Sequence, residues 1–325
     1  LLIGTVVQAA SESRPWQVFE LTLTAREQLA NPYVDGLPDS GASLVRATFT
    51  CDGLRYTITG FWDGEKTWKV RFAPPAPGRW SYETVSSDSG LNGVKDSFAC
   101  QAATEAEMQA NPTLHGFLRV AKTGRHFEYS DGTPFLWIGD TWWNWSKRGI
   151  LFSSFKRLAD DRAAKGFSVG QIYLAGNGGM LDRSYTHPDL EQLRHVEDFI
   201  AYANSKGITV WIHPWWSRKD LNRTVGAEML RRWWRYTLHR LGAYNVIWVL
   251  AGEYNMHNYG GMGLDFWKQL GAMVRREDPY GRIIGVHPTP PLWSGGAAAP
   301  QWSTGEAIHA EAWLDYNQSQ VGHGR

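Results

Sequence analysis

The chain has 325 residues, with 33 Lys and Arg against 32 Asp and Glu, so its formal net charge is only +1. This balance gives no basis for a nucleic-acid partner, and no apolar run approaches the roughly 20 residues of a membrane-spanning helix. The 18 Trp are the unusual part of the composition, and many stand beside Asp, Asn or His. Because an indole ring packs on the C–H face of a sugar while polar neighbours bind its hydroxyls, this pattern favours a carbohydrate partner.

Residues 1–13 begin with the apolar run L-L-I-G-T-V-V and pass into the small residues around V-Q-A-A. This segment is either the remnant of a secretory signal peptide or a first β-strand. The first alternative predicts a secreted or periplasmic protein.

Residues 14–102 show short alternating runs that turn residues interrupt every 8 to 12 positions. That spacing predicts an immunoglobulin-like β-sandwich, which we interpret as an accessory domain because it holds no paired acid and base. The dipeptide Asp52-Gly53 predicts a tight hairpin, and the chain's two cysteines, Cys51 and Cys100, leave open both a disulfide and two free thiols. The expected strands are residues 17–24, 43–50, 54–59, 67–72, 78–86 and 95–99.

Residues 103–113 form a polar linker that ends in Asn111-Pro112. From residue 114 onward, apolar runs of strand length alternate with amphipathic runs of helix length, which predicts β/α units around a parallel sheet. Residues 114–325 are therefore expected to form an incomplete (β/α)8 TIM-type barrel. Its strands are expected at residues 135–139, 168–174, 209–213, 246–251, 283–287 and 311–315, and its helices at 152–165, 189–206, 226–241 and 264–277.

The segment from Val246 to Leu250 has five consecutive apolar residues, which indicates a strand buried on both faces. Glu253 follows this strand at its carboxyl end, where β/α barrels place their chemistry. Glu253 is therefore the candidate catalytic residue, and the alternative is a solvated loop glutamate.

Each predicted strand delivers polar or titratable groups to the same end of the sheet. In a barrel these groups converge on one pocket, whereas in an open doubly wound sheet they would spread along a line. The absence of a Gly-rich phosphate-binding turn also argues against a dinucleotide site, so no cofactor is expected. The expected substrate-binding residues are Asp140, Trp142, Trp143, Asn177, His213, Trp215, Tyr254, Asn255, His287, Asp315 and Asn317.

Glycoside hydrolysis uses two carboxyl groups, one of which protonates the leaving oxygen. Glu253 suits that general acid/base role, because burial among aromatic rings is expected to raise its pKa. The partner carboxyl is not evident, because no other carboxylate near a strand end stands in an obvious strand-end Glu motif. These other carboxylates are Glu306, Glu311, Asp315 and Asp140. One alternative is a carbohydrate-binding protein without catalysis. Another is a metal-dependent hydrolase that uses Asp140, His213 and His287, although no two of these ligands have helix or strand spacing.

Several long motifs resemble a known family. The segments W-Q-V-F-E-L-T-L-T-A, T-G-F-W-D-G and V-R-F-A-P-P-A-P-G-R-W-S-Y resemble the DUF5060-type sandwich domain that precedes many glycosidase barrels. The segments F-E-Y-S-D-G-T-P-F-L-W-I-G-D-T-W-W and W-L-D-Y-N-Q-S-Q-V-G-H-G resemble the apiosidase-like (DUF4038-type) glycoside hydrolase barrels. The resemblance implies a retaining bacterial enzyme that acts on plant or microbial polysaccharide side chains, with Glu253 as acid/base.

The resemblance also implies a nucleophilic Glu after a seventh strand, and no residue here corresponds to it. Six strands before Arg325 suggest a chain truncated at its C-terminus, with the nucleophile beyond the chain end and no second carboxylate about 5 to 5.5 Å from Glu253. An open barrel edge exposes unpaired backbone groups. The gap is then filled by further strands of a longer protein, which we favour, by a second copy of the chain in a homo-oligomer, or by the last residues themselves. The 325-residue chain by itself is expected to have little or no hydrolytic activity. Barrels of the broader clan often have Asn before the acid, whereas this chain has Gly252.

Overall fold

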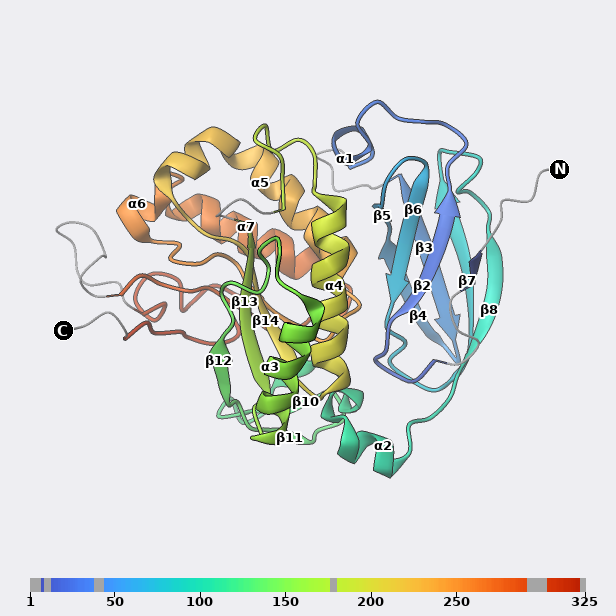
Figure 1. Cartoon of the computed structure of the whole chain (residues 1–325), viewed down its shortest axis with the longest axis horizontal. Coiled ribbons are helices and arrows are strands. Elements are labelled where there is room, and N and C mark those ends of the chain that lie inside the picture. The colour runs from blue at the N-terminus through green and yellow to red at the C-terminus, as the bar shows by residue number, and fades with distance from the viewer. Residues whose placement is uncertain (1–6, 9–12, 38–43, 176–179, 291–302, 322–325) are drawn as a thin grey trace.

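The computed structural model describes residues 7–8, 13–37, 44–175, 180–290 and 303–321. The chain forms a sheet-rich N-terminal part and an α/β C-terminal part that lie side by side, with helix α4 facing the sheets of the N-terminal part (Figure 1).

The N-terminal part consists of two four-stranded antiparallel sheets, of order β1-β2-β6-β5 and β4-β3-β7-β8. Alternate residues of the strands are buried, for example Phe19, Leu21 and Leu23, and the two sheets share one apolar core in which Phe49 stacks on Phe72. All six expected strands form. The bounds are β1 Val7–Gln8, β2 Phe19–Thr24, β3 Val45–Cys51, β4 Leu54–Thr59, β5 Phe61–Trp62, β6 Thr67–Phe72, β7 Gly78–Ser86 and β8 Lys95–Cys100, with the short helix α1 at Pro32–Asp35.

Three local predictions can be compared with this part. Asp52 and Gly53 both have positive φ, as a two-residue hairpin turn requires. Both cysteines are free and buried, with Gly78 of β7 between them, so the disulfide alternative is not formed. In the N-terminal segment, Val7–Gln8 pairs with β2, which is the strand alternative.

The connection between the two parts contains helix α2 (Glu105–Ala110), which begins with a capping box between Thr104 and Glu107. It continues through a 3-10 turn (Pro112–His115) into a small antiparallel sheet of order β11-β10-β9. The strands of this small sheet are β9 Leu118–Val120, β10 Phe127–Tyr129 and β11 Pro134–Phe135.

The C-terminal part is organised around a parallel sheet of order β12-β13-β14-β15-β16. Sequential strand order is the arrangement of a β/α barrel, whereas a doubly wound sheet reverses its order. The strands are β12 Gly139–Thr141, β13 Val169–Ala175, β14 Thr209–Trp215, β15 Val246–Val249 and β16 Ile284–Gly285. The helices are α3 Phe152–Ala164, α4 Leu190–Ser205, α5 Lys219–Leu241, α6 Met256–Gly260 and α7 Leu264–Glu277.

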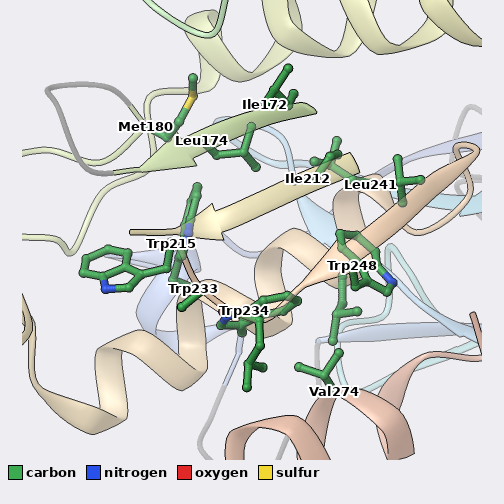
Figure 2. Close-up of a cluster of buried hydrophobic side chains, with 14 of the residues drawn as sticks. Ile172, Leu174, Met180, Ile212, Trp215, Trp233, Trp234, Leu241, Trp248 and Val274 are labelled. Carbon is green, nitrogen blue, oxygen red and sulfur yellow. The ribbon is translucent and has the colours of Figure 1, made fainter. Parts of the chain in front are cut away.

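Helices α3, α4, α5 and α7 pack on one face of this sheet through a single large core. Figure 2 shows this layer, in which Ile212 and Trp248 of the strands lie beside Trp233 and Trp234 of α5. The other face carries Trp211 and Ile247, which pack against the small antiparallel sheet and Tyr316. The segment Val246–Leu250 is buried on both faces, as its sequence predicts.

Two strand predictions were wrong. The first expected strand, residues 135–139, crosses an element boundary, since Phe135 ends β11 and the parallel strand begins only at Gly139. The sixth expected strand, residues 311–315, does not form, because the segment contains a turn at 312–313 and its contact with the sheet is a hydrogen bond from the Asp315 N–H to the Ile284 carbonyl at 3.0 Å. In the described ranges the sheet therefore has five strands, and β12 and β16 each pair with one neighbour. No helix of the described residues is long and apolar enough to cross a membrane.

Candidate active site

Glu253 is held at the carboxyl end of β15 by backbone bonds on both sides. Ladder pairing continues past the strand, with the Gly252 N–H donating to the Trp215 carbonyl at 2.9 Å and the Tyr254 N–H to the His287 carbonyl at 3.1 Å. Glu253 itself has φ of 47° and is only 9% exposed. Left-handed backbone is costly for a residue with a β-carbon and is often found at functional sites. The local backbone thus fixes the direction of this carboxylate.

Glu253 opens onto a cleft of about 670 Å³ at the carboxyl ends of β14 and β15. One wall is the indole of Trp216, and another comes from the first turn of α5 and from α6. The lining residues are Trp216, Arg218, Lys219, Asp220, Arg223, Glu253, Met256 and His257.

An aromatic cluster adjoins this cleft through Trp216. Trp143 contacts Trp216 edge-on at 5.3 Å and His213 at 5.4 Å, measured between ring centroids. His287 lies 5.4 Å from His213 and 5.5 Å from Trp216, and Tyr173 lies 5.7 Å from Trp216. The cluster brings together the loop after β12 and the ends of β13, β14 and β16, so the predicted residues Trp143, His213 and His287 meet one another around Trp216, which itself lines the cleft with Glu253.

His213 is held in its neutral form. Burial lowers its pKa well below the usual value, and the neighbouring His287 lowers it further. The Gln171 amide nitrogen lies 2.7 Å from His213 Nε2, and since that nitrogen can only donate, Nε2 accepts and Nδ1 carries the proton. Nδ1 is buried and has no hydrogen-bond partner among the described residues. His213 therefore offers a hydrogen-bond donor rather than a positive charge.

Gly252 allows Trp216 to reach its place in the cleft wall. A β-carbon at Gly252 would lie 2.1 Å from Trp216 Cε3, far inside van der Waals contact. The indole therefore occupies the space that a side chain at position 252 would fill.

Asp140 and Trp142 do not lie in the pocket, contrary to prediction. Asp140 is within β12 rather than after it, and its carboxylate binds Arg162 of α3 and the Trp142 indole N–H. Trp142 is buried between the sheet and α3, where it packs edge-on against Phe155. Both side chains thus face the helical layer.

Three predicted residues, at the end of β14 and just after β15, have structural contacts. Trp215 is fully buried against α5, where its N–H donates to Asn222 at 2.8 Å, so Trp216 and not Trp215 faces the cleft. Tyr254 is fully buried beside Trp267 and Tyr259, and burial raises its pKa. Asn255 accepts a hydrogen bond from the Thr289 backbone N–H at 2.8 Å and so supports the loop after β16. These placements correct the prediction that the three residues bind substrate directly.

The last predicted residues also lie away from the cleft. Asp315 binds Arg275 and accepts from the Ile284 N–H at 2.7 Å, which places it at the beginning of β16 and not at its carboxyl end. Asn317 accepts from Thr304 at 3.2 Å. Asn177 lies outside the described residues. The prediction that no second carboxylate stands at nucleophile distance from Glu253 stays a prediction.

The metal alternative lacks its geometry. It needs Asp140 beside His213 and His287, whereas Asp140 faces α3 and is paired with Arg162. Across the described ranges no three His, Cys, Asp or Glu side chains gather as a metal site would require.

Sequence patterns did not identify several cleft residues, namely Trp216, Lys219, Arg223, Met256 and His257. They also did not identify Gln320, whose contact with Glu253 is described below. Trp216 stands next to a residue that was predicted, and Met256 and His257 directly follow the Glu253-Tyr254-Asn255 motif, so proximity to a strand end was a usable signal. Lys219 and Arg223 carried none, because a helix start with mixed charges is usually a solvated surface.

A sequence model described as apiosidase-like, catalytic domain, matches residues 121–325, and the domain of unknown function DUF5060 matches residues 12–87. No curated protein matches the chain.

Among solved structures, the chain is similar to a proposed glycoside hydrolase from Bacteroides vulgatus, with 24% identity, a TM-score of 0.70, and coverage of 86% of this chain and 57% of that one. It is also similar to a glycoside hydrolase family 5 protein from the same organism, with 20% identity, a TM-score of 0.56, and coverage of 66% and 47%. The chain thus spans about half the length of these structures. At these identities the likeness establishes the fold alone.

The apiosidase-like match begins in the small antiparallel sheet and includes the parallel sheet, Glu253 and the aromatic cluster. Since it covers more than half of the sequence, the chain belongs to the apiosidase-like family, with residues 121–325 matching its catalytic domain.

Proposed function

We propose that the protein is a glycoside hydrolase that acts on the side chains of plant or microbial polysaccharides, with Glu253 as general acid/base. The observation that carries this proposal is the position of Glu253, which is nearly buried at the carboxyl end of β15 and opens onto a cleft whose wall is Trp216. Family membership and the glycoside hydrolase fold of the structural neighbours support it.

In the proposed reaction, Glu253 transfers protons and the aromatic cluster binds the sugar. The Glu253 carboxylic acid gives its proton to the glycosidic oxygen as the C–O bond breaks, and the carboxylate that remains later takes a proton from the water that attacks the sugar carbon. Trp216 and Trp143 provide flat apolar faces for a sugar ring, and the neutral His213 and the imidazole of His287 beside them suit hydrogen bonds to hydroxyl groups. In the retaining course that we infer from the resemblance, a second carboxylate forms the glycosyl-enzyme bond.

The charge of the cleft indicates which class of glycan it would bind. Arg218 is paired with Asp220 at 2.7 Å, and this hydrogen bond lowers the pKa of Asp220, so the charges of these two residues offset each other. Lys219 and Arg223 form no ion pair with another described residue, so they leave the cleft with excess positive charge. A glycan that carries a carboxylate near the scissile bond would complement this charge.

The test is hydrolysis of a panel of defined neutral and acidic oligosaccharides and aryl glycosides by the wild-type protein and the Glu253→Gln variant. The substitution nearly preserves volume, so the variant should fold normally yet lose at least ~10²-fold in kcat/KM on substrates with poor leaving groups. Glu228→Gln, on the exposed side of α5, is the matched control and should keep wild-type rates. Full activity of Glu253→Gln on a natural linkage would exclude the proposed role.

A carbohydrate-binding protein without turnover is the second candidate, and the aromatic cluster favours it as much as it favours an enzyme. Titration calorimetry with the same panel separates the two, because a pure binding protein shows saturable heat and releases no sugar. We further propose a secreted or periplasmic location, as expected for a protein that meets polymeric glycans, and fractionation of the source cells tests it.

A further inference from the structure

The segment after Thr304 crosses the inner side of the parallel sheet and is pinned there at several points. The Trp211 indole N–H donates to the Tyr316 hydroxyl at 2.8 Å, and the Tyr316 ring lies where a side chain on Gly285 would otherwise stand. Farther along, the Thr304 N–H donates to the Gln318 carbonyl at 3.0 Å, and the Gln318 N–H to the Thr304 hydroxyl at 2.8 Å. This anchoring carries the chain from the sheet interior toward Glu253.

At its end, the segment brings one amide to the candidate acid. Gln320 Nε2 lies 3.4 Å from Glu253 Oε1 and donates to it. The amide oxygen of Gln320 is buried and has no hydrogen-bond partner among the described residues. The Gln320 amide N–H therefore binds the Glu253 carboxylate, and the amide oxygen can still accept a hydrogen bond.

We propose that Gln320 is a positioning residue for Glu253, whose amide donates to the carboxylate and, after half a turn of the amide group, accepts from the carboxylic acid. This inference rests on the proposed role of Glu253. An acid/base residue changes its protonation state twice in each turnover, so a fixed donor would favour only the ionised state and a fixed acceptor only the neutral one. An amide can bind either protonation state of the carboxyl group, because it has an N–H donor and a C=O acceptor side by side in one plane.

Other charged groups face Glu253 and must be held constant in a test. The cleft is also lined by Arg218 just before α5, by Lys219, Asp220 and Arg223 of α5 and by His257 of α6, and His287 lies beside the cluster at the end of β16. Exchanging the Gln320 amide alone leaves all of these in place.

The experiment is a carboxyl ¹³C NMR titration of the whole chain labelled at its glutamate side chains, with Glu253 assigned from the signal that Glu253→Gln removes. Gln320→Met keeps the length of the side chain but has neither amide group. Because the hydrogen bond to the ionised carboxylate is stronger than the one from the neutral acid, its loss should raise the pKa of Glu253 by about 0.5 to 1 unit. Gln320→Glu keeps the shape and adds a like charge, so the rise should be at least as large. Gln318→Met, the same exchange two residues earlier, should leave the pKa within ~0.2 unit of wild type.

Kinetics supplies the second readout. In the active protein, Gln320→Met should shift the alkaline limb of the kcat/KM profile upward by the same amount and lower kcat with little change in KM, which a merely structural role would not do. An unchanged pKa of Glu253 in both Gln320 variants would overturn the inference. A shifted pKa in a protein that hydrolyses nothing would uphold the coupling and reject the proposed function, so the two failures are distinguishable.

Discussion

At the scale of single residues, the cleft depends on which side chain stands beside Glu253. Trp216 can form the wall only because Gly252 has no side chain, and the backbone of Gly252 is not in the left-handed region. The constraint is therefore steric contact with one ring and not backbone strain. Glu253, in contrast, carries the strain itself, since it adopts positive φ with a full side chain.

This predicts the effect of Gly252→Ala. The new methyl group would overlap the Trp216 ring, so we expect a stability loss of about 1 to 3 kcal/mol from overpacking and a raised KM as the indole moves. Gly305→Ala is the control, because its β-carbon would meet only ordinary contacts at 3.4 Å or more. Denaturant unfolding and steady-state kinetics measure the two effects, and equal behaviour of both variants would contradict the packing argument.

At the scale of elements, α6 is a left-handed turn rather than an ordinary helix. His257, Asn258, Tyr259, Gly260 and Gly261 all have φ between 48° and 74°. Left-handed helix costs roughly 1 to 2 kcal/mol per residue with a side chain, so neighbours must hold it. Asn222 donates to the Gly260 carbonyl at 3.0 Å and Trp267 to the Tyr259 carbonyl at 3.0 Å, and the turn so fixed presents His257 to the cleft.

Two adjacent glycines of this turn provide a matched comparison. Gly261→Ala should lose about 1 kcal/mol, because its φ is positive while its nearest neighbour is the flexible Lys219 side chain at 3.3 Å. Gly260→Ala should lose at least ~2 kcal/mol more, since its β-carbon would lie 2.2 Å from the buried Asn222 amide. Thermal unfolding of the two variants checks the order, and a smaller loss for Gly260→Ala would show that Asn222 yields easily.

At the scale of the whole molecule, buried ion pairs join the sheets of the N-terminal part to the helices of the C-terminal part. Arg71 of β6 binds both oxygens of Glu197 of α4, at 2.7 and 3.0 Å, and Arg240 of α5 binds Asp63 at 2.9 Å. Burial alone would raise the pKa of Asp63, but the positive charges of Arg240, Lys69 and Arg194 outweigh it and lower that pKa. The two parts are therefore expected to unfold together.

Glu197→Gln tests this junction. It leaves two buried guanidinium groups without their full counter-charge, so we expect a loss of about 3 to 5 kcal/mol. Glu83→Gln, which breaks an exposed pair with Lys95, should cost less than ~1 kcal/mol. Calorimetry should show one cooperative transition in the wild type, and two separate transitions would refute the coupling.

The same junction predicts a pH dependence. Asp63 and Glu20 have lowered pKa values in the fold, so their contribution is present above the unfolded value of about 4 and is lost as the pH falls through the folded values. The wild type should thus lose stability on acidification below about pH 4. Asp63→Asn should lose less over that interval, and parallel curves for the two proteins would rule out Asp63 as a source.

Sequence alone determined the type of most elements and one catalytic candidate. Alternating apolar residues along Phe19–Thr24 predict a strand with one buried face, and the continuous apolar run Val246–Leu250 predicts a strand buried on both faces. Both patterns are local, so the sequence alone contains them. Glu253 was found because it is the first carboxylate beyond the most buried strand. Gly226 was likewise recognised as the beginning of a helix, although helical turns from Lys219 precede the kink there.

Only the tertiary structure decided which side chains face the cleft. At a strand end, the twist of the sheet and the continuing backbone hydrogen bonds determine which of two adjacent side chains points to the cleft. Trp216 lines the cleft while Trp215 packs on α5. Trp143 joins the aromatic cluster while Trp142 packs on α3. The sequence near Asp315 has strand-like residues, yet its backbone and carboxylate bind the beginning of β16 and Arg275 instead. Contacts between segments far apart in the chain, such as Gln320 with Glu253, leave no periodic signal, because they arise only when the sheet has placed both segments.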